Sequence, residues 1–217
     1  MQFRYEPSYL KNNLYLQSDP IVVCKANNIN PQFSKIKIDG GNVVNWTDKA
    51  IISERIFDEN PKYTDKTKLI SEIEELLSVE IIIMPHIKSD MTGHADGMVR
   101  FVGPNLLLGN DRSKEYKYWV TGMNKVLKAH NIDYIDIPFF EYKDKKHPET
   151  AIGCYVNYLE VKDLIILPIF DKVKNMDKEV YDLFKQIFPD RIIESIEYNK
   201  IASDGGILNC TTWTIEQ

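Results

Sequence analysis

Three times along the chain, two short β-rich segments are followed by a helical segment and then by another strand. The repeats start near Lys35, Asp96 and Gly153, and turn residues such as Thr47-Asp48 and Gly103-Pro104 separate paired strands in the first two of them. Recurrence of one supersecondary order at a nearly constant interval is typical of a fold built from repeated units. The sequence therefore predicts an α/β fold of ββαβ units in one domain that spans residues 1–217.

Local patterns place the individual elements of these units. A first hairpin is expected over residues 42–53, with its turn at Thr47-Asp48. Leu69, Ile73 and Leu76 recur at helical spacing and indicate an amphipathic helix that covers a sheet. A charged loop is expected over 141–150. The other predicted strands are 35–39, 80–86, 98–102, 105–108, 133–137, 153–159, 163–167 and 191–196, and the predicted helices are 21–27, 64–79, 113–130 and 177–188.

The composition excludes several classes of protein. The chain has 27 Lys and Arg against 32 Asp and Glu, a formal net charge of −5, whereas a protein that neutralises nucleic-acid phosphates needs a clustered basic surface. Its longest apolar runs are far shorter than a membrane span, and its first residues lack the pattern of a secretory signal. We therefore expect a cytoplasmic protein that has neither nucleic acid nor membrane as a partner.

The cysteines argue against a metal site or a disulfide scaffold. Cys24, Cys154 and Cys210 are odd in number and widely spaced, without a CxxC pair or an HExxH motif. Cys24 and Cys154 fit the ordinary reading of a buried small apolar residue. Cys210 follows two glycines, which permit a backbone that presents a thiol in a cleft, although burial in the core is an equally simple reading of one free cysteine.

A histidine and a carboxylate stand two residues apart in Thr92-Gly-His-Ala-Asp-Gly97. If this segment is extended, the side chains of His94 and Asp96 point to the same side, and an imidazole beside a carboxylate is a common arrangement for proton transfer. The alternative, without a catalytic role, is that His94 is a surface histidine in a capped turn. Asp39, which precedes Gly40-Gly41, is by itself only a turn signal.

Four segments together resemble successive blocks of the agmatine deiminase family, also called the bacterial type of peptidylarginine deiminase. They occur in the family's order: Ile38-Asp-Gly-Gly-Asn-Val-Val44, Thr92-Gly-His-Ala-Asp-Gly-Met-Val-Arg-Phe101, Tyr155-Val-Asn-Tyr158 and Gly205-Gly-Ile-Leu-Asn-Cys-Thr-Thr-Trp213. The resemblance covers nearly the whole chain, and the combination is much more specific than any single block.

The resemblance implies a pentein fold, in which ββαβ units surround a pseudo-fivefold axis. It also implies hydrolysis of a guanidinium to a ureido group with release of ammonia, without metal or cofactor. Cys210 would be the nucleophile, His94 the general acid and base, and Asp39 the carboxylate that holds the His94 ring. Asp96, Asn157 and Asp204 would bind the substrate, a small guanidinium compound such as agmatine or an arginine-type molecule, and the agmatine reaction would belong to putrescine biosynthesis.

The sequence departs from the family pattern in two places. The family's Trp-x-Arg-Asp block, which supplies a second guanidinium-binding carboxylate, is not found, so the chain is expected to lack most of the first repeat. Asn209 stands where larger agmatine deiminases have His. These departures leave three readings open: an active guanidine hydrolase, an amidinotransferase or dimethylarginine-type hydrolase with related chemistry, and an impaired family remnant that acts as a binding or assembly module. Exposed strand edges would favour self-association into a homo-oligomer.

Overall fold

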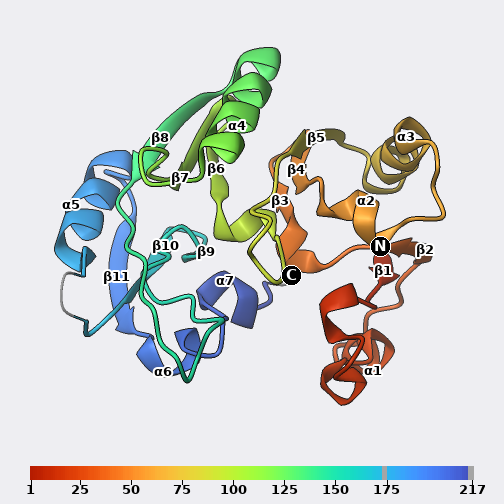
Figure 1. The fold of residues 1–217 in the computed structure, drawn as a ribbon, viewed down its shortest axis with the longest axis horizontal. Helices are drawn as coiled ribbons and strands as arrows, with labels where there is room; N and C mark the ends of the chain where they lie inside the picture. Colours follow the sequence, from red (N-terminus) through yellow and green to blue (C-terminus); the bar gives the residue numbers. More distant parts are fainter. Residues whose placement is uncertain (173–174, 215–217) are drawn as a thin grey trace. The chain divides into compact units, whose positions relative to one another are not determined.

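The computed structural model describes residues 1–172 and 175–214, and the described residues group into two compact units (Figure 1). Unit 1 comprises Met1–Ala95 and Thr121–His130, and unit 2 comprises Asp96–Val120 and the chain from Asn131 onward. Helix α4 (Lys117–His130) therefore contributes residues to both units. The expectation of a single domain over 1–217 stays a prediction.

Unit 1 contains a two-stranded parallel sheet and a three-stranded mixed sheet. In the mixed sheet, the central strand pairs antiparallel with β3 and parallel with β5. Its residues Ala50, Ile51 and Ile52 are almost completely buried, as expected for a strand that is covered on both faces. The strands of unit 1 are β1 (Gln2–Arg4), β2 (Phe33–Lys37), β3 (Val43–Asn45), β4 (Lys49–Ser53) and β5 (Glu80–Met84).

The helices of unit 1 begin where the sequence supplies capping residues. The Asp19 side chain accepts a hydrogen bond from the Ile21 amide at the start of α1 (Pro20–Ala26). The Asp65 side chain accepts from the Thr67 and Lys68 amides at the start of α3 (Lys66–Leu77). A shorter helix, α2 (Arg55–Glu59), directly follows β4. The core of this unit consists of apolar residues from these sheets and helices, among them Ile36, Ile52, Ile56, Leu69 and Ile73.

Unit 2 contains two three-stranded sheets of the same topology. In each sheet an antiparallel hairpin is followed by a helix and a strand that pairs parallel with the second hairpin strand. The first sheet comprises β6 (Val99–Gly103), β7 (Leu106–Asn110) and β8 (Asp133–Ile137), and the second comprises β9 (Leu159–Val161), β10 (Leu164–Ile169) and β11 (Ile192–Glu197).

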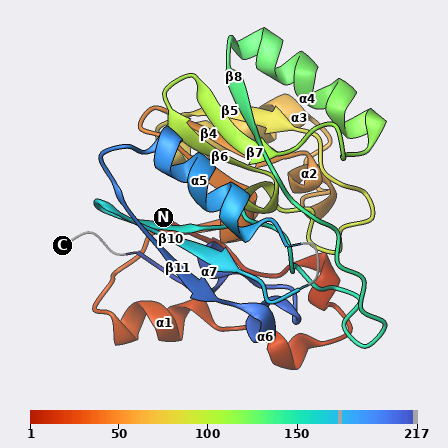
Figure 2. The ribbon, with the colours of Figure 1, turned by 90° about the vertical axis from the view of Figure 1, so that its left-hand side faces the viewer.

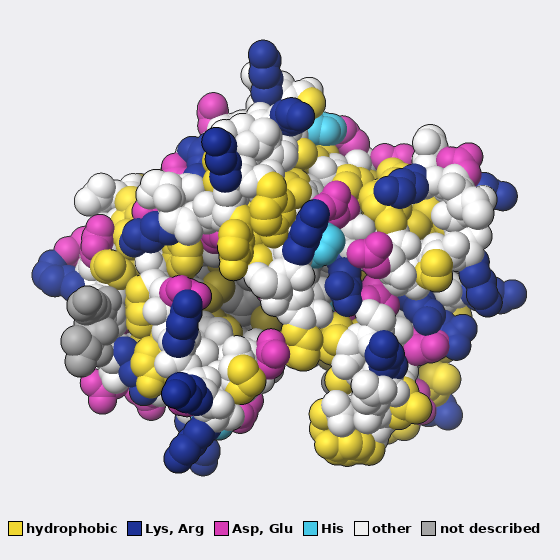
Figure 3. Space-filling model, viewed as in Figure 1, with side chains coloured by type: hydrophobic (Ala, Val, Ile, Leu, Met, Phe, Trp, Pro, Cys, Tyr) yellow, Lys and Arg dark blue, Asp and Glu magenta, His cyan; other side chains and the backbone are white. Residues whose placement is uncertain are grey.

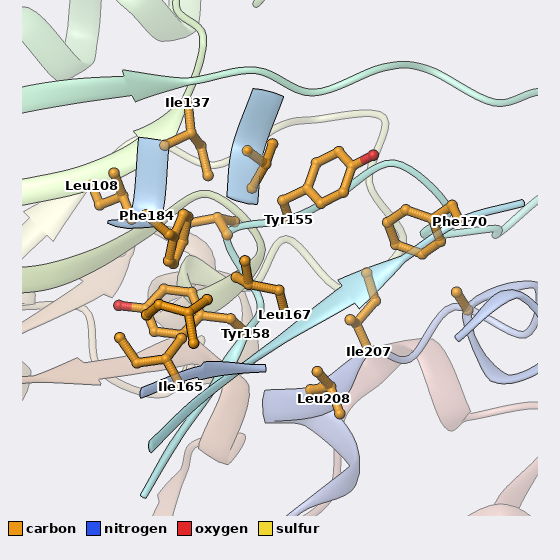
Figure 4. Packing of buried hydrophobic residues seen from close by; sticks show 14 of the residues in the cluster. Leu108, Ile137, Tyr155, Tyr158, Ile165, Leu167, Phe170, Phe184, Ile207 and Leu208 are labelled. Carbon is orange, nitrogen blue, oxygen red and sulfur yellow. The ribbon is translucent and has the colours of Figure 1, made fainter. Parts of the chain in front are cut away.

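Helix α5 (Asp177–Ile187) lies across the β9–β10–β11 sheet (Figure 2). Its residues Val180 and Phe184 are buried in a core that also holds Tyr158, Ile165 and Ile193 (Figure 4). The Tyr158 and Phe184 rings meet edge to face, with centroids 5.0 Å apart, a favoured aromatic geometry. Two short helices, α6 (Asn199–Ala202) and α7 (Leu208–Thr211), follow β11. This core fixes the segment that carries the C-terminal cysteine.

The structure confirms the predicted ββαβ order in all three repeats, which begin at β3, β6 and β9. The first repeat does not start near Lys35 as predicted, because the strand there, β2, pairs with β1 in a separate sheet. It corrects the expected strand over 153–159, because β9 begins only at Leu159 and residues 153–158 form an irregular buried segment. Gly153 has a φ of +98°, and a Cβ there would lie 2.0 Å from the Phe140 carbonyl oxygen. This left-handed backbone is incompatible with a strand.

Exposed apolar side chains gather around α1 of unit 1 (Figure 3). They include Leu14, Tyr15, Leu16, Val22 and Phe33. Across residues 1–172 and 175–214, the structure has no helix of the length and apolarity that a bilayer crossing requires.

We predict that Phe184→Ala lowers the free energy of unfolding by about 3–5 kcal/mol, because it removes a fully buried ring and leaves a cavity. Urea unfolding followed by circular dichroism measures this change. The control is Ile192→Ala, a side chain that is 59% exposed, for which we expect less than about 1 kcal/mol. Equal losses in the two variants would contradict the packing described for α5.

Candidate active site

In unit 1, Asp39 contacts both an imidazole and a phenol. The residue follows β2 and adopts an extended backbone before the 3-10 helix Gly40–Asn42. Its Oδ2 atom lies 2.9 Å from His94 Nε2 and accepts a hydrogen bond of 2.8 Å from the Tyr9 hydroxyl. We call Tyr9, Asp39 and His94 the imidazole cluster. Such a cluster can orient an imidazole and stabilise its protonated form.

The backbone before His94 is fixed by buried contacts. Gly93 has a φ of +62°, and a Cβ there would lie 3.2 Å from the His86 ring, so the position favours glycine. The Gly93 carbonyl oxygen accepts a 2.7 Å hydrogen bond from the Ser53 hydroxyl, which is fully buried at the end of β4. The side chains of His94 and Asp39 remain 16% and 13% exposed. The ring is therefore held in place while it keeps some contact with solvent.

In unit 2, a buried carboxylate lies beside a thiol. Asp96 is only 1% exposed, and its Oδ2 atom accepts a 2.8 Å hydrogen bond from Asn209 Nδ2. The Cys210 Sγ atom lies 3.5 Å from the same oxygen. We call Asp96, Asn157, Asn209 and Cys210 the thiol cluster. Among the residues that the structure describes, no Lys, Arg or His forms an ion pair with Asp96, and a buried carboxylate of this kind is a strong binding site for a positive group.

The environment of Cys210 keeps its thiol protonated. The residue as a whole is exposed, but its sulfur lies among groups that remove it from water. This desolvation, followed by the negative charge of Asp96, raises the pKa of the thiol to about 12. Because a raised pKa favours the neutral form, the resting group is a thiol at neutral pH. A cation bound to Asp96 would offset its negative charge and so lower the pKa of the thiol.

Asn157 links the two parts of the thiol cluster. Its Nδ2 atom donates to the Asp96 carbonyl oxygen, and its Oδ1 atom accepts from the Cys210 amide, each at 3.2 Å. The Asn157 carbonyl oxygen also accepts from the Asn209 amide at 3.2 Å. Asn157 is 2% exposed and lies in the irregular segment that replaces the expected strand. These contacts favour a role in positioning the backbone of Asp96 and Cys210.

Arg100 fixes the orientation of the Asn209 amide. The Arg100 guanidinium donates to Asn209 Oδ1 at 2.8 Å and to the Tyr158 carbonyl oxygen at 3.2 Å. Because Oδ1 accepts from Arg100, the Nδ2 group of Asn209 is directed toward Asp96. Arg100 lies in the Thr92–Phe101 segment, but no role for it was predicted. The signal in the sequence was an arginine in a predicted strand, four residues after Asp96.

The Thr92–Gly97 motif is not the extended acid–imidazole pair that its spacing predicted. Ala95–Gly97 form a 3-10 helix, so the alternation of an extended segment does not hold. His94 contacts Asp39 in unit 1, whereas Asp96 contacts Asn209 and Cys210 in unit 2. The motif therefore supplies one residue to each cluster.

The remaining candidates have contacts other than the Asp96 side chain. The Asp204 side chain is 78% exposed and lies 3.3 Å from His147 Nδ1. Cys24 is buried, and Cys154 is half-buried with its Sγ atom 3.4 Å from the Gly97 carbonyl oxygen. Within the described residues, no three side chains of His, Cys, Asp or Glu are grouped as a metal site would need.

Comparisons with known proteins agree on one family. A sequence profile of the Porphyromonas-type peptidyl-arginine deiminases matches residues 21–215. A protein of Listeria monocytogenes is 24% identical over 210 residues, which cover 82% of this chain and 54% of that protein. The agmatine deiminase of Stutzerimonas stutzeri is 23% identical over 206 residues, with coverages of 82% and 54%. The chain spans about half the length of these curated relatives.

Solved structures show the same fold at low sequence identity. The structure of the C. jejuni agmatine deiminase with substrate bound matches with a TM-score of 0.75 and 18% identity, covering 97% of this chain and 66% of that one. The agmatine deiminase of Enterococcus faecalis matches with a TM-score of 0.71 and 15% identity, with coverages of 88% and 60%. The chain therefore has the α/β pentein fold that the sequence predicted.

We predict that Asp96→Asn raises the rate at which iodoacetamide alkylates Cys210 at pH 8, by about threefold to tenfold. Removal of the neighbouring negative charge lowers the pKa of the thiol and increases its thiolate fraction, while the desolvation remains. Peptide mass spectrometry measures the rate. Asp163→Asn, an exposed site in unit 2, serves as control, and an unchanged or slower rate in Asp96→Asn would contradict the description of the thiol cluster.

Proposed function

The chain belongs to the Porphyromonas-type peptidyl-arginine deiminase family, and on that premise we propose that it is a cofactor-independent hydrolase of guanidinium compounds. It converts the guanidinium group of agmatine or an arginine-type molecule to a ureido group and releases ammonia. One observation carries this proposal: a cysteine thiol lies 3.5 Å from a buried carboxylate that has an amide and a thiol as its partners.

Asp96 would bind the substrate cation and thereby activate the nucleophile. A guanidinium is planar and permanently protonated, so a carboxylate is its natural partner. Once the cation is in place, the negative charge that disfavours the Cys210 thiolate is compensated, and the pKa of the thiol falls. The thiol then gives its proton to the neutral imidazole of His94, and the resulting thiolate attacks the guanidinium carbon. The same carboxylate thus adds to the desolvation that keeps the thiol protonated in the free protein, and it favours ionisation of the thiol when substrate binds.

His94 would move the protons of both half-reactions. In the first half-reaction a C–S bond forms, a C–N bond breaks, and the protonated imidazole gives a proton to the departing ammonia. In the second, the neutral imidazole takes a proton from water, whose oxygen attacks the thiouronium carbon. The C–O bond forms, and the C–S bond breaks to return the thiolate. Asp39, 2.9 Å from Nε2, would stabilise the imidazolium, and Asn157 would position the thiol.

Agmatine is the first substrate to test. It would give carbamoylputrescine, a product on a route to putrescine, whereas free arginine or peptidyl-arginine would give a citrulline. The three cysteines are free, as is usual in a reducing compartment, and we propose that the reaction takes place in the cytoplasm. We propose that Asp204, an exposed carboxylate, contacts the part of the substrate beyond the guanidinium, and that the active form is a homo-oligomer.

We predict that the unsubstituted chain releases ammonia from agmatine or an arginine-type substrate, and that Cys210→Ser lowers the rate at least about 1,000-fold, because the nucleophile is lost. Asp39→Asn is expected to lower kcat by roughly 10- to 100-fold through weaker support of the imidazolium. A coupled ammonia assay measures both rates.

Cys24→Ala is the matched control, since this cysteine belongs to neither cluster, and it should keep the unsubstituted rate. Absence of ammonia release from agmatine, arginine and a peptide with a C-terminal arginine would overturn the proposed activity. It would favour instead the reading of a binding or assembly module.

We further predict that a haloacetamidine, a reactive analogue of the guanidinium, modifies Cys210 much faster than it modifies Cys24 or Cys154. The amidinium cation binds Asp96 and so favours the thiolate beside it. His94→Ala should remove most of this preference, since the imidazole takes part in activating the thiol. Labelled peptides quantified by mass spectrometry give the three rates, and equal reactivity of the three cysteines would contradict the assigned roles.

A further inference from the structure

Two different groups share one oxygen atom of Asp39. The Tyr9 hydroxyl donates to Oδ2 at 2.8 Å, and His94 Nε2 lies 2.9 Å from the same atom. The Tyr9 and His94 rings also meet edge to face, with centroids 6.1 Å apart. A carboxylate oxygen that accepts a phenol hydrogen bond carries less charge for a second partner. Tyr9 and the imidazole therefore compete for the charge of Asp39.

The position of Tyr9 is built by contacts outside this cluster. Tyr9 lies in the 3-10 helix Ser8–Leu10, and the preceding Ser8 is bound to helix α2. The Ser8 amide donates to Glu59 Oε2 at 2.9 Å, and its hydroxyl donates to Glu59 Oε1 at 2.5 Å. Arg55 donates to the Ser8 hydroxyl at 2.9 Å and to Glu59 at 3.2 Å. This network holds the segment that delivers the Tyr9 hydroxyl to Asp39.

The charged groups around the imidazole cluster have carboxylate partners of their own. A small cavity beside the cluster is lined by Lys37, Arg55 and Glu59 together with Tyr9, Asp39 and His94. Lys37 lies 3.1 Å from Glu6, and Arg55 lies 3.2 Å from Glu59. Tyr9 is thus the neutral donor that contacts Asp39 directly.

Tyr9 remains a donor over the whole working range of pH. Burial, followed by the negative charge of Asp39, raises the pKa of its phenol far above the ordinary value. A protonated phenol can donate to Asp39 but cannot compete as a charged group. The hydroxyl is therefore a fixed feature of the carboxylate's surroundings, unlike the imidazole, which changes its charge.

We propose that Tyr9 is a positioning residue of the active site, whose hydroxyl withdraws charge from Asp39 and so sets how strongly that carboxylate holds the protonated form of His94. The inference rests on the proposed function, in which His94 gives a proton in one half-reaction and takes one in the next. An imidazolium held too tightly by Asp39 would give up its proton slowly. The phenol limits this hold and keeps the ring able to serve as both acid and base.

The test is an NMR titration of the histidine ring signals in the intact chain. The four histidines are assigned by single substitutions. In Tyr9→Phe we expect the titration midpoint of His94 to move upward by about half a pH unit or more, because Asp39 keeps more charge for the imidazolium. Tyr63→Phe is the matched control, since it removes a hydroxyl that donates to Glu72 at the same 2.8 Å, and it should leave the midpoint unchanged.

A second variant keeps the proposal testable if Tyr9→Phe does not fold. A fluorinated tyrosine placed at position 9 by codon suppression keeps the ring and the hydroxyl but is a stronger donor, so the His94 midpoint should move downward. Opposite shifts in the two variants, with the His86 and His130 signals unchanged, support the proposal. An unchanged His94 midpoint in both variants, or shifts of the same sign, would overturn it.

The titration also separates this inference from the proposed function. It requires no substrate and no turnover, so an inactive chain in which Tyr9→Phe raises the His94 midpoint would refute the activity and leave the coupling of Tyr9 to His94 intact. Where ammonia release is measurable, kcat/KM can be followed as a function of pH. In Tyr9→Phe the fall of kcat/KM on the basic side should shift to higher pH, in the same direction as the NMR midpoint of His94. An active chain whose profile does not move would refute the positioning role alone.

Discussion

The buried carboxylate of Asp96 is the constraint on which the C-terminal segment depends. A carboxylate that is 1% exposed costs free energy unless hydrogen bonds replace its water. Here the Asn209 amide and the Cys210 thiol provide them, and Arg100 orients the amide. The apolar core of unit 2 anchors the same segment through Ile207 and Leu208. Satisfying one buried charge therefore also fixes where the thiol lies.

The carboxylates of the two clusters have different surroundings, which suit different tasks. Asp96 has neutral partners, an amide and a thiol, and so can accept a cation. Asp39 already shares one oxygen between a phenol and an imidazole, and so can tune a proton carrier. Enzymes commonly give two carboxylates separate roles by placing them in different environments.

The repeated units could be predicted from the sequence, but the backbone conformation around the candidate site residues could not. Period-2 and helical patterns correctly predicted the first two hairpins and the helices α3, α4 and α5, because each element buries one face. The expected strand at 153–158 was wrong because an aromatic, apolar run has the composition of a strand. The left-handed backbone at Gly153, where the Phe140 carbonyl oxygen leaves no space for a Cβ, depends on a contact that the local sequence does not show. The extended interpretation of Thr92–Gly97 was also wrong, because the left-handed Gly93 is followed by a 3-10 helix at Ala95–Gly97.

Contacts between distant residues could not be predicted from patterns at all. Asp39 and His94 were paired only through the family resemblance, since 55 residues separate them. Tyr9 carries no motif, and its hydroxyl became relevant only when the fold placed it against Asp39. Asn157 lies in a recognised block, but its contacts with the Asp96 and Cys210 backbones depend on an irregular segment that no periodicity describes.

The central claim is that Cys210 attacks a guanidinium carbon. The most direct measurement is intact-protein and peptide mass spectrometry of the chain after acid quenching during incubation with agmatine. The account predicts that the peptide containing Cys210 carries the mass of agmatine less ammonia, and that this adduct is absent from Cys210→Ser. Ammonia release by Cys210→Ser at the rate of the unsubstituted chain would contradict it.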